Sequence, residues 1–289
     1  MNLLLYWLGR LFVTSVQSLP LRWVARLGRV AGALAWRLDG RHRRVALDNL
    51  TRCFGGEKTA AEIRAIGAEN FCRIGENYLS AIKTAAMDFE ALRPHMEFIG
   101  HDRLPSAVAG CRLRNVVVAI GHFGNFELYA RLNGFRPDYH TATTYRALKQ
   151  PALNRLMQEL RERSGCLFFE RRTEGTALRE AMNRGGIVLG LLADQSSLGL
   201  RGPFLGHDCN TGLAPAILAL RYDCDLYTGI CYRIGLGRWE MELGEQITTR
   251  VDGKMRPTAD IMREVNLAFE AAVRRDPANW FWVHRRWKD

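Results

Sequence analysis

Hydrophobic residues recur along this chain with two spacings that alternate. Short uninterrupted apolar runs predict buried strands at 116–120 and 187–193. Weaker runs predict strands at 96–99, 140–145, 166–169, 226–233 and 238–243. Apolar positions three or four residues apart predict helices at 45–54, 60–86, 126–133, 151–164, 176–183, 213–222 and 258–274. Alternating strands and helices predict an α/β fold, a three-layer α/β/α sandwich with a mostly parallel or mixed sheet.

The first forty residues follow a different pattern. Residues 1–21 are apolar apart from a few polar side chains that share one helical face: Arg10, Thr14, Gln17 and Ser18. We expect this helix to lie in a membrane interface, because an arginine in the middle of a spanning helix is costly. Residues 21–38 are also apolar but contain four arginines, which can extend toward anionic headgroups. The alternative is an ordinary amphipathic pair packed on the protein. The change of pattern near residue 40 predicts a membrane-associating segment at 1–40 and a second domain at 41–289.

The distribution of charge along the chain indicates that both ends of the chain contact an anionic surface. The net charge is +11, and residues 1–52 contribute +7 through nine arginines and two aspartates. Residues 274–289 contribute a further +3, so the centre is nearly neutral. A nucleic-acid-binding face would instead interleave basic and aromatic residues along a folded surface, and we expect no nucleic-acid partner.

Cysteine and histidine spacing excludes the common metal sites. The seven cysteines form no C-x-x-C pair, and none of the seven histidines stands in an H-E-x-x-H or H-x3-H arrangement. The thiols are expected to be small buried hydrophobic groups in a reducing compartment, and no metal or cofactor is expected.

The chemistry concentrates in Gly-His-Phe-Gly-Asn-Phe-Glu, residues 121–127, directly after the strand at 116–120. His122 is a candidate general base, and Glu127 is expected to reach back to one of its nitrogens and fix the tautomer. Asn125 is expected to cap the following helix. Gly121 and Gly124 lack a Cβ, so a substrate can approach the backbone there. The alternative is purely structural: an imidazole closing a strand and a glutamate at a helix end.

This heptapeptide resembles the H-x4-D/E motif of the glycerolipid acyltransferases, and most closely the bacterial lipid A biosynthesis acyltransferases of the lauroyl and myristoyl transferase type. The resemblance extends over nearly the whole chain. Further matching stretches are Asp48-Asn49-Leu50, Tyr145-Arg146, Asp194-Gln195, residues 202–206 and the closing Trp-Phe-Trp-Val-His-Arg-Arg-Trp-Lys, residues 280–288.

The resemblance implies an acyltransferase of lipopolysaccharide biosynthesis. It would move a fatty acyl chain from acyl carrier protein, or from acyl-CoA, to a hydroxyl of a lipid A precursor or a related glycolipid. It implies a place at the cytoplasmic face of the bacterial inner membrane, either as a monotopic protein or with a single N-terminal anchor. By this match His122 deprotonates the hydroxyl, while Glu127 orients His122 and stabilises the imidazolium. There is no G-x-S-x-G motif that would indicate a covalent acyl-enzyme.

Six further residues are expected to bind substrate or support the site: Gly124, Asn125, Arg146, Arg172, Asp194 and Gln195. Arg146 would bind a phosphate of the acceptor or carrier. Arg171 and Arg172 would form an anion clamp, and Asp194 and Gln195 would lie around the site. His284 is expected to be structural. Two alternative functions stay open: a lysophospholipid or glycerol-phosphate acyltransferase, and a non-catalytic basic protein that binds membranes.

Overall fold

The computed structural model describes residues 3–107 and 112–287 of the chain, so Cys111 and Lys288 lie outside the described residues. Its centre is a seven-stranded sheet in the order β1-β9-β8-β2-β5-β3-β4. The strands of this sheet are β1 (Met96–Ile99), β2 (Val116–Ile120), β3 (His140–Tyr145), β4 (Leu167–Glu170), β5 (Ile187–Leu192), β8 (Asp225–Gly235) and β9 (Arg238–Leu243). Neighbouring strands are parallel except for the β8–β9 pair, so the sheet is mixed but mostly parallel, as predicted.

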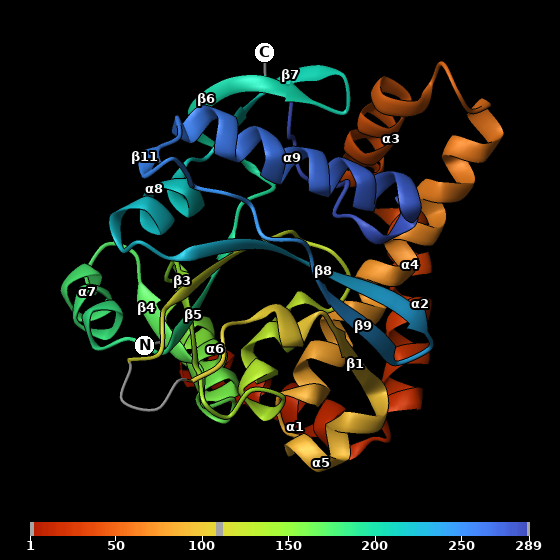
Figure 1. Ribbon diagram of the computed structural model, residues 1–289. Helices are drawn as coiled ribbons and strands as arrows, with labels where there is room; N and C mark the ends of the chain where they lie inside the picture. The colour runs from red at the N-terminus through yellow and green to blue at the C-terminus, as the bar shows by residue number, and fades with distance from the viewer. Residues whose placement is uncertain (1–2, 108–111, 288–289) are drawn as a thin grey trace.

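Two apolar cores cover the two faces of this sheet. Every residue of β2 is buried, and its side chains alternate between the cores. Val117 and Ala119 join the core under α8 (Ala214–Arg221) and α9 (Thr258–Arg275), whereas Val118 and Ile120 join the core on the opposite face. Figure 1 shows α8 and α9 on one side of the sheet and α1 and α5 on the other.

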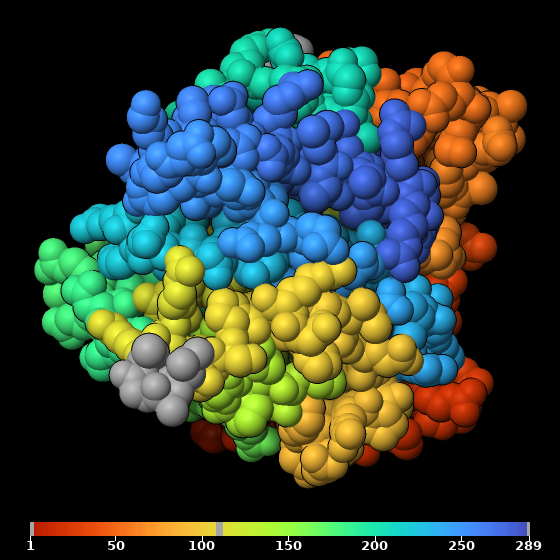
Figure 2. All heavy atoms as spheres, viewed as in Figure 1, coloured from red at the N-terminus to blue at the C-terminus, as the bar shows by residue number. Residues whose placement is uncertain are grey.

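The remaining helices surround this centre. They are α1 (Leu3–Ser18), α2 (Leu21–Leu38), α3 (Gly40–Phe54), α4 (Ala60–Thr84), α5 (Phe89–Leu92), α6 (Pro151–Glu162) and α7 (Gly175–Arg184). In the part of the chain that the structure describes, the 3₁₀ segments are η1 (Arg93–His95), η2 (His101–Arg103), η3 (Phe126–Gly134) and η4 (Pro277–Asn279). Segments far apart in sequence meet: Figure 2 shows orange α3 and α4 against blue α9, where Arg274 of α9 pairs with Glu57.

Glycines bring α2 and α4 unusually close together. A Cβ on Gly32 would lie 2.1 Å from the Phe71 carbonyl oxygen, and one on Gly75 would lie 2.1 Å from the Gly28 carbonyl oxygen. Their backbones therefore touch, and α2 is fixed along the length of α4. Within the described ranges, no helix combines the length and apolarity needed to cross a membrane.

Three local predictions need correction. The segment after residue 125 is a 3₁₀ helix rather than an α-helix, and Asn125 makes no capping hydrogen bond. Its Nδ2 instead donates to Thr84 Oγ1 (3.5 Å), and tight 3₁₀ turns are a usual way for an uncapped segment to satisfy its amides. The sequence pattern also missed two hairpins, β6 (Ser196–Phe204) with β7 (His207–Thr211), and β10 (Arg250–Val251) with β11 (Lys254–Met255). Both are largely exposed, so neither has a clear alternation of apolar and polar residues.

Candidate active site

The candidate site lies where neighbouring parallel strands end. In the β2–β5 pair, Ile120 lies opposite Leu192, and each strand is followed two residues later by a polar side chain. These residues are His122 and Asp194, so the register of the sheet alone places them opposite each other. The loops after β3 and β4 open at the same edge, as expected for carboxyl ends of parallel strands.

Asp194 holds His122 through both of its carboxylate oxygens. Oδ1 lies 2.6 Å from His122 Nδ1, and Oδ2 accepts the His122 backbone N–H at 2.8 Å. The Asp194 side chain is completely buried, while 16% of the His122 side chain remains exposed. Burial opposes ionisation, but the charge and donors of His122 and the indole of Trp280 hold the pKa of Asp194 below its usual range. The ionised carboxylate therefore accepts from Nδ1–H and leaves Nε2 as the basic nitrogen.

This geometry corrects the role expected for Glu127. The carboxylate that binds the imidazole is Asp194, and Glu127 instead pairs with Arg161, with 2.9 Å between Oε1 and Nη2. Glu127 occupies the second position of η3, as expected, but its side chain points to α6 and not back to His122. Arg161 lies on the last turn of α6 and also packs over the rings of Tyr145 and Phe168.

The glycines of the motif make room for protein rather than for substrate. Gly124 has φ of +51°, and a Cβ there would lie 2.5 Å from the Cys231 carbonyl oxygen. A Cβ on Gly121 would lie 2.3 Å from the Phe123 ring. Both positions therefore require glycine because the chain packs on itself. Gly124 and Asn125 still contribute to the wall of a cavity beside His122.

Two cavities meet at His122. A narrow one of about 240 Å³ runs between α4, η3 and α6, and is lined mainly by apolar side chains such as Ile74, Ile82 and Leu160. A wide cleft of about 690 Å³ opens over the carboxyl ends of β2, β3 and β5. Residues common to both linings include His122, Glu127 and Arg161. The imidazole therefore stands at the junction of an apolar space and a more polar one.

Cationic side chains line the wide cleft. Arg146 follows β3, Arg171 follows β4, and the neutral Gln195 follows β5. Arg172, expected to bind substrate, is exposed outside the cleft lining and donates its backbone N–H to Glu170 Oε2 (2.7 Å). Arg171 rather than Arg172 is therefore the arginine of this pair that faces the cleft.

Glu170 is a supporting residue that sequence reasoning missed. Besides Arg172, it accepts hydrogen bonds from the backbone of Thr173 at 3.0 Å and of Ala147 at 3.5 Å. These donors hold the pKa of Glu170 below its usual range. The carboxylate thus joins the loops that carry Arg146 and Arg171. The only sequence signal was an acidic residue directly before the Arg-Arg pair.

Two more residues at the site were not expected. Arg161 appeared only as one charge among several on a predicted amphipathic helix. Trp280 donates its indole N–H to Asp194 Oδ2 at 2.7 Å, from a segment 86 residues away in sequence. The rings of Phe126 and Phe281 lie 5.0 and 5.9 Å from the imidazole centroid and limit its rotation. His284, expected to be structural, lies in the same C-terminal segment, where its carbonyl accepts from Asn49.

A deprotonated cysteine nucleophile is disfavoured at this site. Cys166 lines the wide cleft, but burial raises the pKa of its thiol to about 12, so it stays protonated at neutral pH. Across the described part of the chain, no three His, Cys, Asp or Glu side chains cluster as metal ligands would. The arrangement supports direct proton abstraction by His122 from a group bound in the cleft.

Comparison with known proteins agrees with this chemistry. The family model for bacterial lipid A biosynthesis acyltransferases matches residues 1–289, the whole chain. No curated protein matches the chain. Membership of this family implies acyltransferase activity with an acyl donor and a lipid acceptor. The chain belongs to the bacterial lipid A biosynthesis acyltransferase family.

Proposed function

We propose that this protein transfers a fatty acyl chain from acyl carrier protein to a hydroxyl of a lipid A precursor, with His122 as the general base. The observation that carries the proposal is the position of His122: a buried carboxylate holds it at the junction of an apolar cavity and a cationic cleft. A lysophospholipid acyltransferase needs the same base, so the acceptor is the part of the proposal that rests on the family.

The proton transfers follow from the tautomer. Asp194 accepts from Nδ1–H, so Nε2 takes the proton of the acceptor hydroxyl as its oxygen attacks the thioester carbonyl. The imidazolium formed is stabilised by the ionised Asp194. When the tetrahedral intermediate collapses, the C–S bond breaks and the imidazolium returns the proton to the leaving sulfur. The products are the ester and the free thiol, with no covalent acyl-enzyme.

Glu127 and Arg161 contribute to the same acyl-transfer step. Arg161 lies in the lining of both cavities, and its buried Nε has no hydrogen-bond partner among the described groups. In this proposal the guanidinium stabilises the oxyanion that forms on the thioester carbonyl. Glu127 holds the guanidinium in place through Nη2.

The two cavities separate the two substrates. The narrow apolar cavity along α4 takes the acyl chain of the donor, since hydrocarbon is the ligand that matches its walls. The wide cleft takes the acceptor, whose phosphate groups meet Arg146 and Arg171. Gln195 lies beside the acceptor as a neutral hydrogen-bonding group.

The N-terminal helices would bind the cytoplasmic face of the bacterial inner membrane. Large apolar side chains of α1 and α2 are exposed to solvent: Leu3, Leu4, Trp7, Leu8, Leu11, Phe12, Trp23, Leu27, Val30, Leu34 and Leu38. Many large apolar side chains exposed on two successive helices indicate an interaction site. Exposed arginines of α2 such as Arg22 and Arg26 flank it, which fits an anionic lipid surface.

Acyl transfer tests the chemical part of the proposal. The purified protein is given acyl carrier protein charged with C10–C16 chains and a tetra-acylated Kdo–lipid A precursor, and mass spectrometry identifies the products. We expect a mass gain of one acyl group that disappears with His122→Ala. A parallel assay with the same acyl chains on coenzyme A compares acyl carrier protein and coenzyme A as donors. A folded protein that acylates lysophospholipids but not the lipid A precursor would exclude the proposed acceptor.

Vesicle sedimentation tests the membrane part. Leu8→Glu/Leu11→Glu on α1 is expected to release the protein from vesicles containing anionic lipid. The matched control is Leu267→Glu, because Leu267 is similarly exposed but lies on α9. Equal binding of both variants would place the membrane contact elsewhere.

A further inference from the structure

Trp280 completes the hydrogen bonding of Asp194 from a distant part of the chain. Oδ2 of Asp194 receives two donors, the Trp280 indole N–H at 2.7 Å and the His122 backbone N–H at 2.8 Å. Trp280 is almost entirely buried and packs against Trp282 with ring centroids 4.7 Å apart. The indole is therefore a fixed donor, aimed at the carboxylate that holds the base.

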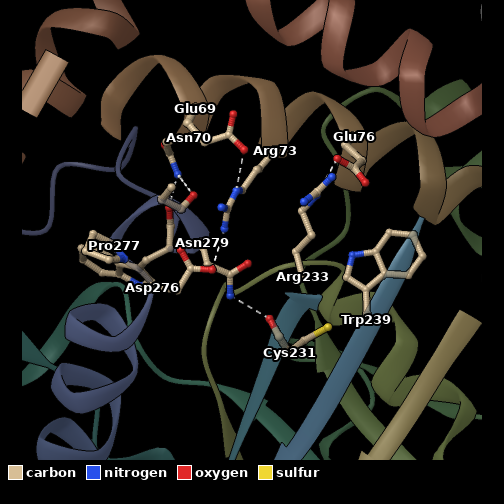
Figure 3. Close-up of polar contacts among 12 residues, drawn as sticks. Glu69, Asn70, Arg73, Glu76, Cys231, Arg233, Trp239, Asp276, Pro277 and Asn279 are labelled. Carbon is tan, nitrogen blue, oxygen red and sulfur yellow. Dashed lines mark hydrogen bonds and ion pairs between the residues drawn. The ribbon is translucent and has the colours of Figure 1, made fainter. Parts of the chain in front are cut away.

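The segment that carries Trp280 is itself anchored to α4. Asn70 donates through Nδ2 to the carbonyls of Ala278 and Trp280, and Arg73 pairs with Asp276 at 2.6 Å. Asn279 donates to the carbonyl of Cys231 on β8 at 2.9 Å. Figure 3 shows these contacts side by side, with Asn70 and Arg73 reaching down from α4 to the segment after α9. The backbone at residues 276–280 is thus attached to both a helix and the sheet.

The segment also contacts the His122 loop directly. The Gly124 backbone N–H donates to the Asn279 carbonyl (3.3 Å), and Phe123 forms a bridge with Trp280. The next residue, Phe281, places its ring beside the imidazole. One short segment therefore contacts the base, its carboxylate and the loop that carries the base.

We propose that Trp280 is a positioning residue for catalysis: its indole N–H sets the orientation and ionisation of Asp194, and through Asp194 the orientation of His122. The proposal rests on His122 being the general base. It assigns to the C-terminal segment a part in the reaction and not only in packing.

Among the described residues, the charged groups that act on Asp194 are His122 and Arg286. Arg286 is buried, donates to the Asn210 carbonyl at 2.9 Å, and favours the ionised form of Asp194 only through space. Losing the indole donor leaves Oδ2 with the backbone N–H of His122 alone. Asp194 then takes up a proton at higher pH, and the carboxylate is held only by its two contacts with His122.

The test compares two tryptophans of the same cluster. Trp280→Phe removes the donor to Asp194, and Trp282→Phe is the matched control, since Trp282 is also buried but donates to the Pro277 carbonyl. We expect Trp280→Phe to lower kcat about tenfold, the effect of one lost hydrogen bond to a charged group, with KM nearly unchanged. The acidic limb of its kcat–pH profile should move to higher pH. Trp282→Phe should leave that limb in place.

A spectroscopic readout separates this proposal from the proposed function. In ¹H NMR of the ¹⁵N-histidine-labelled protein, the Nδ1 proton of His122 should resonate far downfield and disappear in His122→Ala. Trp280→Phe should shift this signal and Trp282→Phe should not, whether or not the protein acylates the chosen acceptor. An unchanged signal and an unchanged limb in folded Trp280→Phe would overturn the proposal.

A second variant covers the case that Trp280→Phe does not fold. Trp280→His keeps a ring N–H in a smaller side chain, and its readout is the Nδ1 proton signal of His122, because the new imidazole itself titrates near the acidic limb. At a pH where the new imidazole is neutral, we expect this signal to stay near its wild-type position. A signal displaced by this donor-retaining variant as far as by loss of the donor, with Trp282→Phe unaffected, would show that the N–H is not what matters. That result would also overturn the proposal.

Discussion

Replacing Asp194 with asparagine is expected to remove most of the activity while keeping the shape of the site. The side chain is completely buried and accepts three N–H groups, two from His122 and one from Trp280. An amide cannot accept at every one of these positions, and its own NH₂ favours the His122 tautomer with the proton on Nε2. Because Nε2 must be free to act as the base, kcat should fall by about 10³- to 10⁴-fold, roughly 4–5.5 kcal/mol.

The assay is acyl transfer from acyl carrier protein under saturating acceptor, with Glu127→Gln as the comparison. Glu127 is 31% exposed and pairs with Arg161 instead of His122. Its loss should act only through the placement of Arg161 and cost about 10- to 100-fold in kcat, less than the roughly 10²- to 10³-fold that follows outright removal of an oxyanion-stabilising group. Asp194→Asn should therefore be the more damaging variant by at least one order of magnitude.

Acid unfolding gives an independent measure on the same variant. The folded-state pKa of Asp194 lies below the ordinary value of 3.8, so the ionised carboxylate stabilises the fold above that value. This contribution is lost as the pH falls through the folded-state pKa. Between about pH 4 and pH 2, the free energy of unfolding should fall more steeply in the wild type than in Asp194→Asn.

The activity assay decides between the two carboxylates. If Asp194→Asn keeps more than about a tenth of the wild-type activity while Glu127→Gln abolishes it, the assignment of Asp194 as the partner of the base is refuted.

Three further predictions follow from packing, nucleophile chemistry and charge. Gly32→Ala should lower the free energy of unfolding by about 1–3 kcal/mol in urea titrations, because the new Cβ meets the α4 backbone; Gly175→Ala, whose Cβ meets nothing, should not. Cys166→Ala should keep near-wild-type kcat, and intact-mass spectrometry should find no acyl-enzyme in either protein; a trapped acyl thioester would contradict direct transfer. Arg146→Ala/Arg171→Ala should raise KM for a bisphosphorylated acceptor more than for its dephosphorylated form, and an equal change for both would exclude a phosphate contact.

The fold was predictable wherever a segment is buried on a regular face. The apolar run at 116–120 and the β-branched run at 140–145 are strands with the predicted bounds, since each buries side chains in a core of the sheet. The β6–β7 hairpin was missed for the converse reason. Most residues of β6 are exposed and its sequence contains Gly and Pro, so no apolar alternation marks it as a strand. Periodicity in a sequence reflects which residues are buried, and few residues of β6 are buried.

The candidate site was predictable only as far as each residue carried its own signal. His122 and Asp194 each follow an apolar strand, which placed both at carboxyl ends of the sheet. Their pairing depends on β2 and β5 being neighbours with Ile120 opposite Leu192, and that register is a property of the whole sheet. Trp280 gave no chemical signal, because an indole in an aromatic-rich segment is ordinarily a packing residue.

The choice between two carboxylates shows why nearness in sequence misled. Glu127 is five residues from His122, but η3 carries its side chain toward α6, where about a third of it meets solvent and Arg161 neutralises it. Asp194 is 72 residues away, yet the strand register brings it beneath the imidazole, out of water and among three N–H donors. A base needs a partner whose position and ionisation do not fluctuate, and burial with several donors provides both. Orientation therefore falls to Asp194, and the part-buried Glu127–Arg161 pair does not contact the base through a hydrogen bond.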